Sequence, residues 1–136
     1  MSWVLKAQFA VRAIPKAQPR TKATIRGTHA AVYTPQTARG WKDAIIESAL
    51  RFPVRGLECP IALKCEFFLK RPKARKKELF VITKPDIDNL LKSTMDALTE
   101  LGIWRDDAQV CETSASKKYE TEAIAPGAYI AIYAWE

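Results

Sequence analysis

Acidic residues in the second half of the chain have a spacing that could bind a divalent cation. Asp86 and Asp88 lie two residues apart, so their side chains share one side of an extended or turning segment. Two converging carboxylates can hold a hard cation such as Mg²⁺, which prefers oxygen ligands and keeps several waters. A third carboxylate, from Asp106 or Asp107, would complete a site for one or two ions, which can activate water for phosphodiester hydrolysis.

A lysine accompanies the acidic pair. Lys92 follows Asp88 by four residues, which places both on one helix face, where its ammonium group could contact a scissile phosphate.

Each acidic residue also has an ordinary structural explanation. Asp86 or Asp88 alone would most often cap a helix, and the later pair of aspartates could be turn residues. Asp96 is better explained as the i+4 partner of Lys92 than as a metal ligand.

Charge is distributed unevenly along the 136 residues, whose formal net charge is +7. Residues 1–84 carry 18 basic and 5 acidic side chains, whereas residues 85–136 carry 4 basic and 10 acidic ones. The basic first part indicates a polyanionic partner such as nucleic acid. Two basic segments and one further lysine are therefore predicted to contact phosphates. The predicted DNA-binding residues are Lys16, Arg20, Lys22 and Arg26, then Lys70, Arg71, Lys73, Arg75, Lys76 and Lys77, and finally Lys84.

The hydrophobic pattern predicts both strands and helices. Alternating apolar side chains predict strands over residues 3–13, 61–69, 110–118 and 128–135. Apolar residues at helical spacing predict one helix over 37–52. A second helix is predicted to begin near Asp86–Asp88 and to end before Gly102, a residue suited to the C-terminal cap.

These elements predict an α/β fold, with the order β-α-β-α-β-β in a single domain over residues 1–136. The sheet is expected to be mixed, with about four strands, and to be accompanied by two helices. From Pro15 to about Thr34 the alternation is lost, and basic and turn-forming residues predict a long loop. His29 in this loop is the only histidine, which excludes His-based zinc sites and histidine triads.

The cysteines and the N-terminal residues indicate the cellular compartment in which the protein is expected. Cys59, Cys65 and Cys111 form no CxxC pair and are odd in number, so we expect reduced thiols that pack as small buried apolar residues. No apolar run is long enough to span a membrane, and the first residues lack the features of a signal peptide. We expect a cytoplasmic protein with no membrane partner.

Three segments of the second half carry a specific motif: Pro85-Asp-Ile-Asp-Asn-Leu-Leu-Lys92, Met95-Asp-Ala-Leu98 and Gly102-Ile-Trp-Arg-Asp-Asp-Ala-Gln-Val110. Together with Ile14-Pro15, Gln18-Pro-Arg20 and Val32-Tyr-Thr-Pro35 upstream, they resemble the RusA family of Holliday junction resolvases. These are small, homodimeric, Mg²⁺-dependent endonucleases common in prophages. The resemblance covers roughly residues 14–110.

The resemblance implies site residues and partners. Asp86, Asp88 and Asp107 match the family's catalytic, metal-binding carboxylates, and Lys92 matches its catalytic lysine. It implies Mg²⁺ as cofactor, with Mn²⁺ as a substitute and no small-molecule cofactor. It also implies a homodimer that makes paired symmetric incisions in four-way junction DNA during recombination and repair. Two alternatives stay open: a nuclease for other branched DNA such as flaps and forks, and a non-catalytic module that binds branched DNA.

Other motif positions receive lesser roles. Asp106 and Asn89 match the motif and are given supporting roles only. Pro85 stands where some members have an arginine, which leaves Lys84 as the local candidate for a positive charge beside the scissile phosphate. Trp104 could stack against an opened base, but core packing is the favoured interpretation.

Geometry suggests that the acidic residues do not meet within one subunit. A helix from Asp88 to Leu101 spans roughly 21 Å at 1.5 Å rise per residue. The five residues 102–106 reach at most about 17 Å when extended, so a full return along the helix is difficult. We therefore hypothesise that at least one acidic ligand is contributed across the interface of a symmetric dimer.

Overall fold

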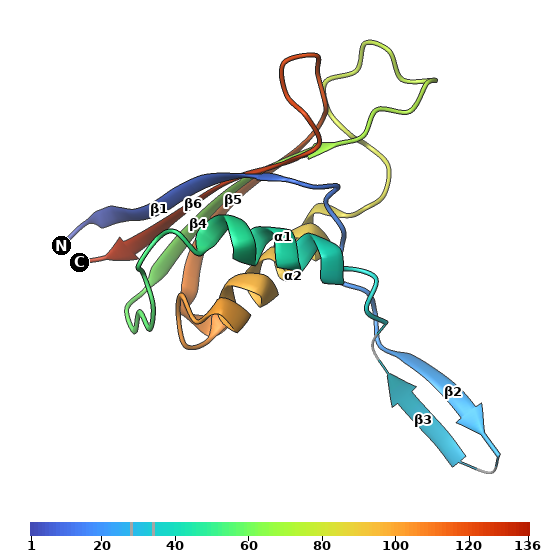
Figure 1. Ribbon diagram of the computed structural model, residues 1–136, viewed down its shortest axis with the longest axis horizontal. Coiled ribbons are helices and arrows are strands. Elements are labelled where there is room, and N and C mark those ends of the chain that lie inside the picture. The colour runs from blue at the N-terminus through green and yellow to red at the C-terminus, as the bar shows by residue number, and fades with distance from the viewer. Residues whose placement is uncertain (28, 34) are drawn as a thin grey trace.

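A four-stranded mixed sheet forms the body of the protein in the computed structural model (Figure 1), which describes residues 1–27, 29–33 and 35–136, and of Arg26 only the backbone. The strand order across the sheet is β1-β6-β4-β5. Strand β6 is antiparallel to both β1 and β4, and β5 is parallel to β4. The predicted α/β fold with a mixed sheet of four strands is confirmed. These strands are β1 (Trp3–Arg12), β4 (Ile61–Leu69), β5 (Val110–Tyr119) and β6 (Gly127–Trp135).

Two helices cover one face of this sheet (Figure 1). Helix α1 (Arg39–Ala49) is shorter than predicted at both ends, whereas α2 (Ile87–Leu101) has the expected bounds. Gly102 ends α2 in the left-handed conformation, with φ of 83°, which glycine adopts without steric cost. A short 3₁₀ helix, η1 (Asp107–Gln109), then leads into β5. In the described part of the chain, no helix is both long and apolar enough to cross a membrane.

The prediction of a long basic loop between Pro15 and Thr34 holds for residues 15–21, which form neither helix nor strand, but it is wrong for the two segments that follow; Thr34 lies outside the described residues. The chain there forms a two-stranded antiparallel sheet of β2 (Lys22–Arg26) and β3 (His29–Tyr33), which extends away from the body (Figure 1). Each strand has only five residues, and among the described residues the two strands pair only with each other. An apolar alternation this short was masked by the surrounding prolines and basic residues, which are typical of loops.

The hydrophobic core lies between the sheet and the two helices. The largest buried side chains come from both layers, and they include Trp41 and Leu98 on the helices and Phe67 and Ile132 on the strands. Trp104 belongs to the same core: its side chain is 1% exposed, and its Nε1 donates a hydrogen bond to Thr99 Oγ1 at 2.8 Å. The packing interpretation of Trp104 is therefore confirmed, and stacking on a base is not available to it.

The cysteines are unpaired, as expected, but they differ in burial. Cys65 lies in the core, and burial raises the pKa of its thiol to about 12. Cys59 is half-buried. The prediction that all three are buried is wrong for Cys111, which is exposed on β5, the strand at the edge of the sheet.

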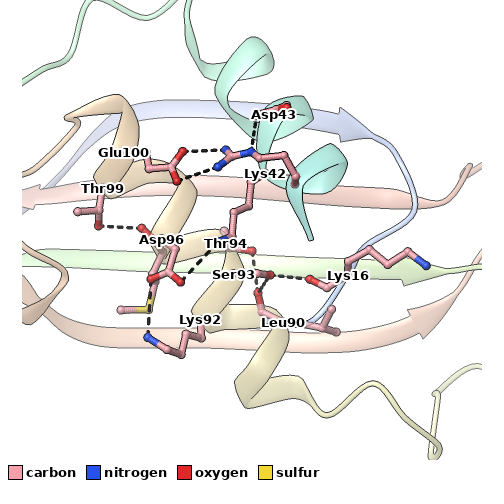
Figure 2. A network of polar contacts seen from close by, with 12 residues as sticks. Lys16, Lys42, Asp43, Leu90, Lys92, Ser93, Thr94, Asp96, Thr99 and Glu100 are labelled. Carbon is pink, nitrogen blue, oxygen red and sulfur yellow. Dashed lines mark hydrogen bonds and ion pairs between the residues drawn. The ribbon is translucent and has the colours of Figure 1, made fainter. Parts of the chain in front are cut away.

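An ion pair joins the two helices (Figure 2). The Arg39 guanidinium donates to both carboxylate oxygens of Glu100, at 2.9 and 2.7 Å, and its Nε donates to Asp43 Oδ1 at 2.9 Å. The hydrogen bonds from Arg39 lower the pKa of Glu100 below its ordinary value. Because all three side chains are well exposed, solvent screening keeps the contribution of this pair to stability small.

We expect Glu100→Gln to destabilise the fold at pH 7 by no more than about 1 kcal/mol. A carboxyl group whose pKa is lowered by folding stabilises the protein above its unfolded pKa, and this contribution is lost as the pH falls through the folded pKa. The difference in the free energy of unfolding between wild type and variant should therefore vanish in acid. Urea unfolding across pH 3 to 8 measures this difference. Glu122→Gln, in the exposed β5–β6 loop, is the control and should show no such pH dependence.

Candidate active site

Asp86 and Asp88 lie at the N-terminus of α2, and both side chains are exposed. Asp86 occupies the N-cap position with extended backbone angles, yet its side chain makes no capping hydrogen bond to the described backbone. Asp88, in the first turn, accepts a hydrogen bond from the backbone N–H of Asn89 at 2.9 Å. The Asp86 carboxylate thus sits where a cap is usual without acting as one, and it is available for another ligand.

Two clefts meet at Asp86. One, of about 520 Å³, is lined by Asp86 and Asp88 together with Phe80 and residues 115–117 of β5. The other, of about 540 Å³, contains Asp86 beside Asn89 and three lysines: Lys16, Lys70 and Lys84. Asp86 therefore lines the same cleft as three of the lysines that the sequence predicts to contact phosphates, Lys16, Lys70 and Lys84.

The segment leading into Asp86 is fixed by a lysine that the sequence did not single out. Lys117 Nζ, on β5, donates to the carbonyl oxygens of Thr83 and Pro85 at 2.7 and 2.8 Å. This contact ties the loop before α2 to the edge strand and sets the position of Asp86. Lys117 is 32 residues from Pro85 in the chain, so local sequence patterns carry no signal for it.

The basic segment after β1 is held beside the same helix end. Ser93 Oγ donates to the carbonyl oxygen of Lys16 at 2.7 Å, and the backbone N–H of Gln18 donates to the carbonyl oxygen of Asn89 at 3.0 Å (Figure 2 shows Lys16 and Ser93). These bonds keep Lys16 near the acidic pair although 70 residues separate it from Asp86.

Lys92 lies one helical turn beyond Asp88, and its side chain is 59% exposed. Its Nζ is 3.7 Å from Asp96 Oδ1, as expected for an i+4 pair, and Lys42 Nζ approaches the other oxygen of Asp96 at 3.9 Å (Figure 2). Asp96 therefore forms ion pairs with two lysines, and its predicted pairing with Lys92 is confirmed. Lys92 remains accessible to a phosphate at the helix surface.

Asp106 and Asp107 lie at the opposite end of α2. Asp106 Oδ1 accepts a hydrogen bond from the N–H of Ala108 at 2.9 Å, while Gln109 Oε1 accepts from the N–H of Asp106 at 3.0 Å. This reciprocal capping box gives Asp106 a structural role. Asp107 is the first residue of η1 and is half-buried.

The three predicted ligands do not come together within one chain. Helix α2 separates Asp86 and Asp88 from Asp107, and its 15 residues span about 22 Å. Across the described residues, no group of three or more His, Cys, Asp or Glu side chains is close enough to hold a metal ion. The chain therefore provides Asp86 and Asp88 at one end of α2, and at the other end Asp107 next to the capping residue Asp106.

The basic segment after β4 has two kinds of residue. Arg71 is turned inward: its Nη1 donates to the carbonyl oxygens of Arg75 and Glu78 at 3.1 and 2.8 Å, and its guanidinium lies 5.0 Å from the ring centroid of Tyr119. Arg71 therefore shapes the loop. Arg75 is half-buried, and its Nη1 lies 3.8 Å from Glu78 Oε1. The remaining lysines of the segment point into solvent, where phosphates can reach them. These are Lys70, Lys73, Lys76 and Lys77.

The other predicted DNA contacts lie near the β2–β3 hairpin. Arg20 and Lys22 are exposed at its base. The side chain of Arg26 lies outside the described part of the structure.

Comparison with known proteins gives the family. A family model described as endodeoxyribonuclease RusA matches residues 12–133. The uncharacterized protein YqaN of Bacillus subtilis (strain 168) is 32% identical over 128 residues, which cover 85% of this chain and 89% of YqaN. The crossover junction endodeoxyribonucleases RusA of Escherichia coli (strain K12) and Enterobacteria phage 82 are 35% and 34% identical over 80 residues. Those matches cover 59% of this chain and 52%, about half, of each of these two relatives.

An α/β domain that exposes paired carboxylates beside a basic cleft has the features of an enzyme acting on nucleic acid phosphates. This chain belongs to the RusA endodeoxyribonuclease family, whose model covers nearly all of it. The resemblance carried by the motifs between Pro85 and Val110 is confirmed, and so is the predicted enzyme class, an endodeoxyribonuclease.

Proposed function

We propose that this protein is a Mg²⁺-dependent, homodimeric endonuclease that resolves Holliday junctions by paired symmetric incisions. The observation that carries the proposal is the exposed pair Asp86 and Asp88, set where two clefts meet beside three lysines. Its relatives in Escherichia coli and phage 82 are named crossover junction endodeoxyribonucleases, which supports a branched DNA substrate.

The donor atoms at this site suit magnesium. Asp86 and Asp88 offer exposed carboxylate oxygens, and Mg²⁺ in enzymes is usually held by one or two carboxylates and several waters. Asp107 is proposed as the third ligand, and Mn²⁺ would substitute because it accepts the same oxygen donors. When bound, the metal supplies an activated water and stabilises the leaving oxygen of the phosphodiester.

Side chains of the protein position the substrate. Lys92 is proposed to contact the scissile phosphate, and Lys84, beside Asp86 in the basic cleft, to offset its developing charge. The exposed lysines after β4 and the basic residues between β1 and β3 would grip the arms of the junction. Such contacts with phosphates give affinity that depends on salt and little on sequence.

A synthetic four-way junction tests the proposal. Purified protein is incubated with the labelled junction in Mg²⁺ or EDTA, beside a linear duplex, a flap and a fork of related sequence. Symmetric paired nicks in the junction alone, dependent on the metal, are the expected result. Preferential cutting of the flap or fork would identify a nuclease for other branched DNA. Binding that survives EDTA, without cutting in Mg²⁺ or Mn²⁺, would identify a non-catalytic DNA-binding module.

The double substitution Lys76→Gln/Lys77→Gln is expected to weaken junction binding about tenfold at low salt and to lower the salt slope of log K by about 2, since each phosphate contact contributes close to 1. Both side chains are exposed, so the fold should be unaffected. Fluorescence anisotropy from 50 to 200 mM salt measures both quantities. Arg51→Gln/Arg55→Gln removes the same charge near the opposite end of β4 and should change neither. Equal effects of the two double variants would contradict a specific role for the loop.

A further inference from the structure

The β2–β3 hairpin has two different faces. Its register pairs Ala23 with Val32 and Ile25 with Ala30, and because side chains alternate along a strand, these four residues share one face. All four are exposed, Ile25 to 78% and Val32 to 71%, and none of them belongs to a hydrophobic core of the described chain. We call these four residues the hairpin patch.

The hairpin patch is flat and purely apolar. Ile25 and Val32 stand at diagonal positions of the ladder, where side chains are about 7–8 Å apart, and the two alanines occupy the other corners. None of the four side chains carries a hydrogen-bonding group. Such a surface can pack against the face of a base, but it cannot form the hydrogen bonds by which base edges are read.

Strand propensity alone does not account for this arrangement. Isoleucine and valine favour strands wherever they stand, yet here the alternation leaves both on the same face as two alanines. The other face carries polar residues, among them Lys22, Thr24 and His29. A two-stranded hairpin is only marginally stable in water by itself, so an apolar face exposed on one indicates a partner that covers it.

Charge and position identify DNA as that partner. Residues 13–38 contain four Lys and Arg residues and no Asp or Glu, which favours a polyanion. The hairpin also starts beside the acidic pair, because the N–H of Gln18 donates to the carbonyl oxygen of Asn89, the residue after Asp88, at 3.0 Å. The seven residues from Gln18 to Ile25 reach at most about 25 Å. DNA bound at the acidic pair is therefore within reach of the hairpin patch.

We propose that the hairpin patch packs against the base pair at the branch point of a four-way junction, and that this contact makes the protein prefer junctions to linear duplex. Inside a duplex both faces of every base pair are stacked, so an apolar surface can enter only by breaking a stack. At a branch point the arms can open, and a base pair then loses one stacking neighbour. The inference rests on the proposed function, from which the junction substrate is taken.

The double substitution Ile25→Thr/Val32→Thr tests the contact. Threonine keeps the branched side chain that suits a strand but replaces apolar surface with a hydroxyl group. Fluorescence anisotropy in EDTA should show junction affinity about tenfold lower and duplex affinity within about twofold of wild type. The salt slope of log K should stay the same, because no charge is removed.

A matched control lies on β1. Val4→Thr/Leu5→Thr also removes two exposed apolar side chains, which are 37% and 47% exposed, and it should change neither affinity. Unchanged junction affinity in Ile25→Thr/Val32→Thr would overturn the inference. So would an equal loss of affinity for junction and duplex, which would place the patch in a groove of an arm instead of at the branch point.

A fluorescent base reports the contact directly. 2-Aminopurine emits more strongly when its neighbours no longer stack on it. Placed beside the branch point, it should rise in emission at least about twofold when wild-type protein saturates the junction in EDTA, whereas the same base in the middle of an arm should not change. Ile25→Thr/Val32→Thr at saturation should lose most of this rise. Equal rises for wild type and variant would overturn the contact with the branch-point base pair.

Sedimentation without DNA tests a second copy of the chain as the occupant of the hairpin patch. If the patch were covered by another copy, Ile25→Thr/Val32→Thr would lower the oligomeric state and keep the wild-type ratio of junction to duplex affinity. That result would overturn the inference. An unchanged sedimentation coefficient together with a reduced ratio supports it.

The outcomes separate this inference from the proposed function. Wild-type protein that cuts the junction in Mg²⁺, with a double variant that keeps the full preference for junctions, overturns the role of the hairpin patch and leaves the resolvase proposal standing. A double variant that loses this preference, in a protein that cuts no branched DNA, supports the role of the patch and overturns the proposed resolvase activity.

Discussion

Asp88→Asn is expected to slow cleavage of a four-way junction by at least about 1000-fold, while junction affinity stays within about threefold of wild type. The amide keeps the shape of the side chain but removes the charge that would hold Mg²⁺. Asp88 is exposed, so the fold should tolerate the change. Single-turnover cleavage in Mg²⁺, and anisotropy binding in EDTA, measure the two effects separately. The same result is expected for Asp86→Asn.

The asparagine substitution also separates catalysis from helix capping. Asparagine caps helices about as well as aspartate, so Asp86→Asn preserves the N-cap position of α2. A loss of cleavage with unchanged thermal stability therefore cannot arise from a lost cap. Asp43→Asn, an exposed carboxylate on α1, is the matched control and should retain activity. Retained cleavage by both Asp86→Asn and Asp88→Asn would contradict the assignment of these residues.

Local patterns predicted the strands of the main sheet and the two helices that cover it. The alternation over residues 61–69 reproduced β4 residue for residue, and Gly102 marked the end of α2 through its left-handed conformation. The β2–β3 hairpin was missed because neither strand packs on the core, so neither needs a long apolar alternation. Cys111 was misjudged for a related reason. Burial depends on the position of a strand in the sheet, and the sequence does not show that β5 is an edge.

The candidate site was predictable in its parts but not in its contacts. The rise of a helix was enough to separate Asp88 from Asp107, and the structure places them at opposite ends of α2. The bonds from Lys117 to the loop before Asp86 join residues more than 30 positions apart. The inward turn of Arg71 depends in the same way on Tyr119. Composition shows that a segment is basic, but only the fold shows which of its side chains remain free for DNA.

Trp104 links the segment that carries Asp106 and Asp107 to the core, and its removal should have the largest effect on stability. Trp104→Ala deletes a 1% exposed indole and leaves Thr99 Oγ1 without its donor, at an expected cost of about 3–5 kcal/mol. For a domain of this length the unfolding temperature should fall by roughly 10 °C or more. Urea and thermal unfolding measure both. Trp3→Ala, at a half-buried tryptophan whose ring lies 5.2 Å from that of Trp135, should cost clearly less.

A conservative variant decides whether Trp104 also acts on DNA. Trp104→Phe keeps most of the buried apolar surface but loses the hydrogen bond to Thr99, so it should be only moderately destabilised. Below its unfolding transition it should cut the junction at the wild-type rate, because a buried ring has no face for a base. Full stability combined with a large loss of cleavage would instead mean that Trp104 leaves the core when DNA binds. The distinction matters because Trp104 lies three residues before Asp107, and a core residue there anchors the end of α2 from which that carboxylate is presented.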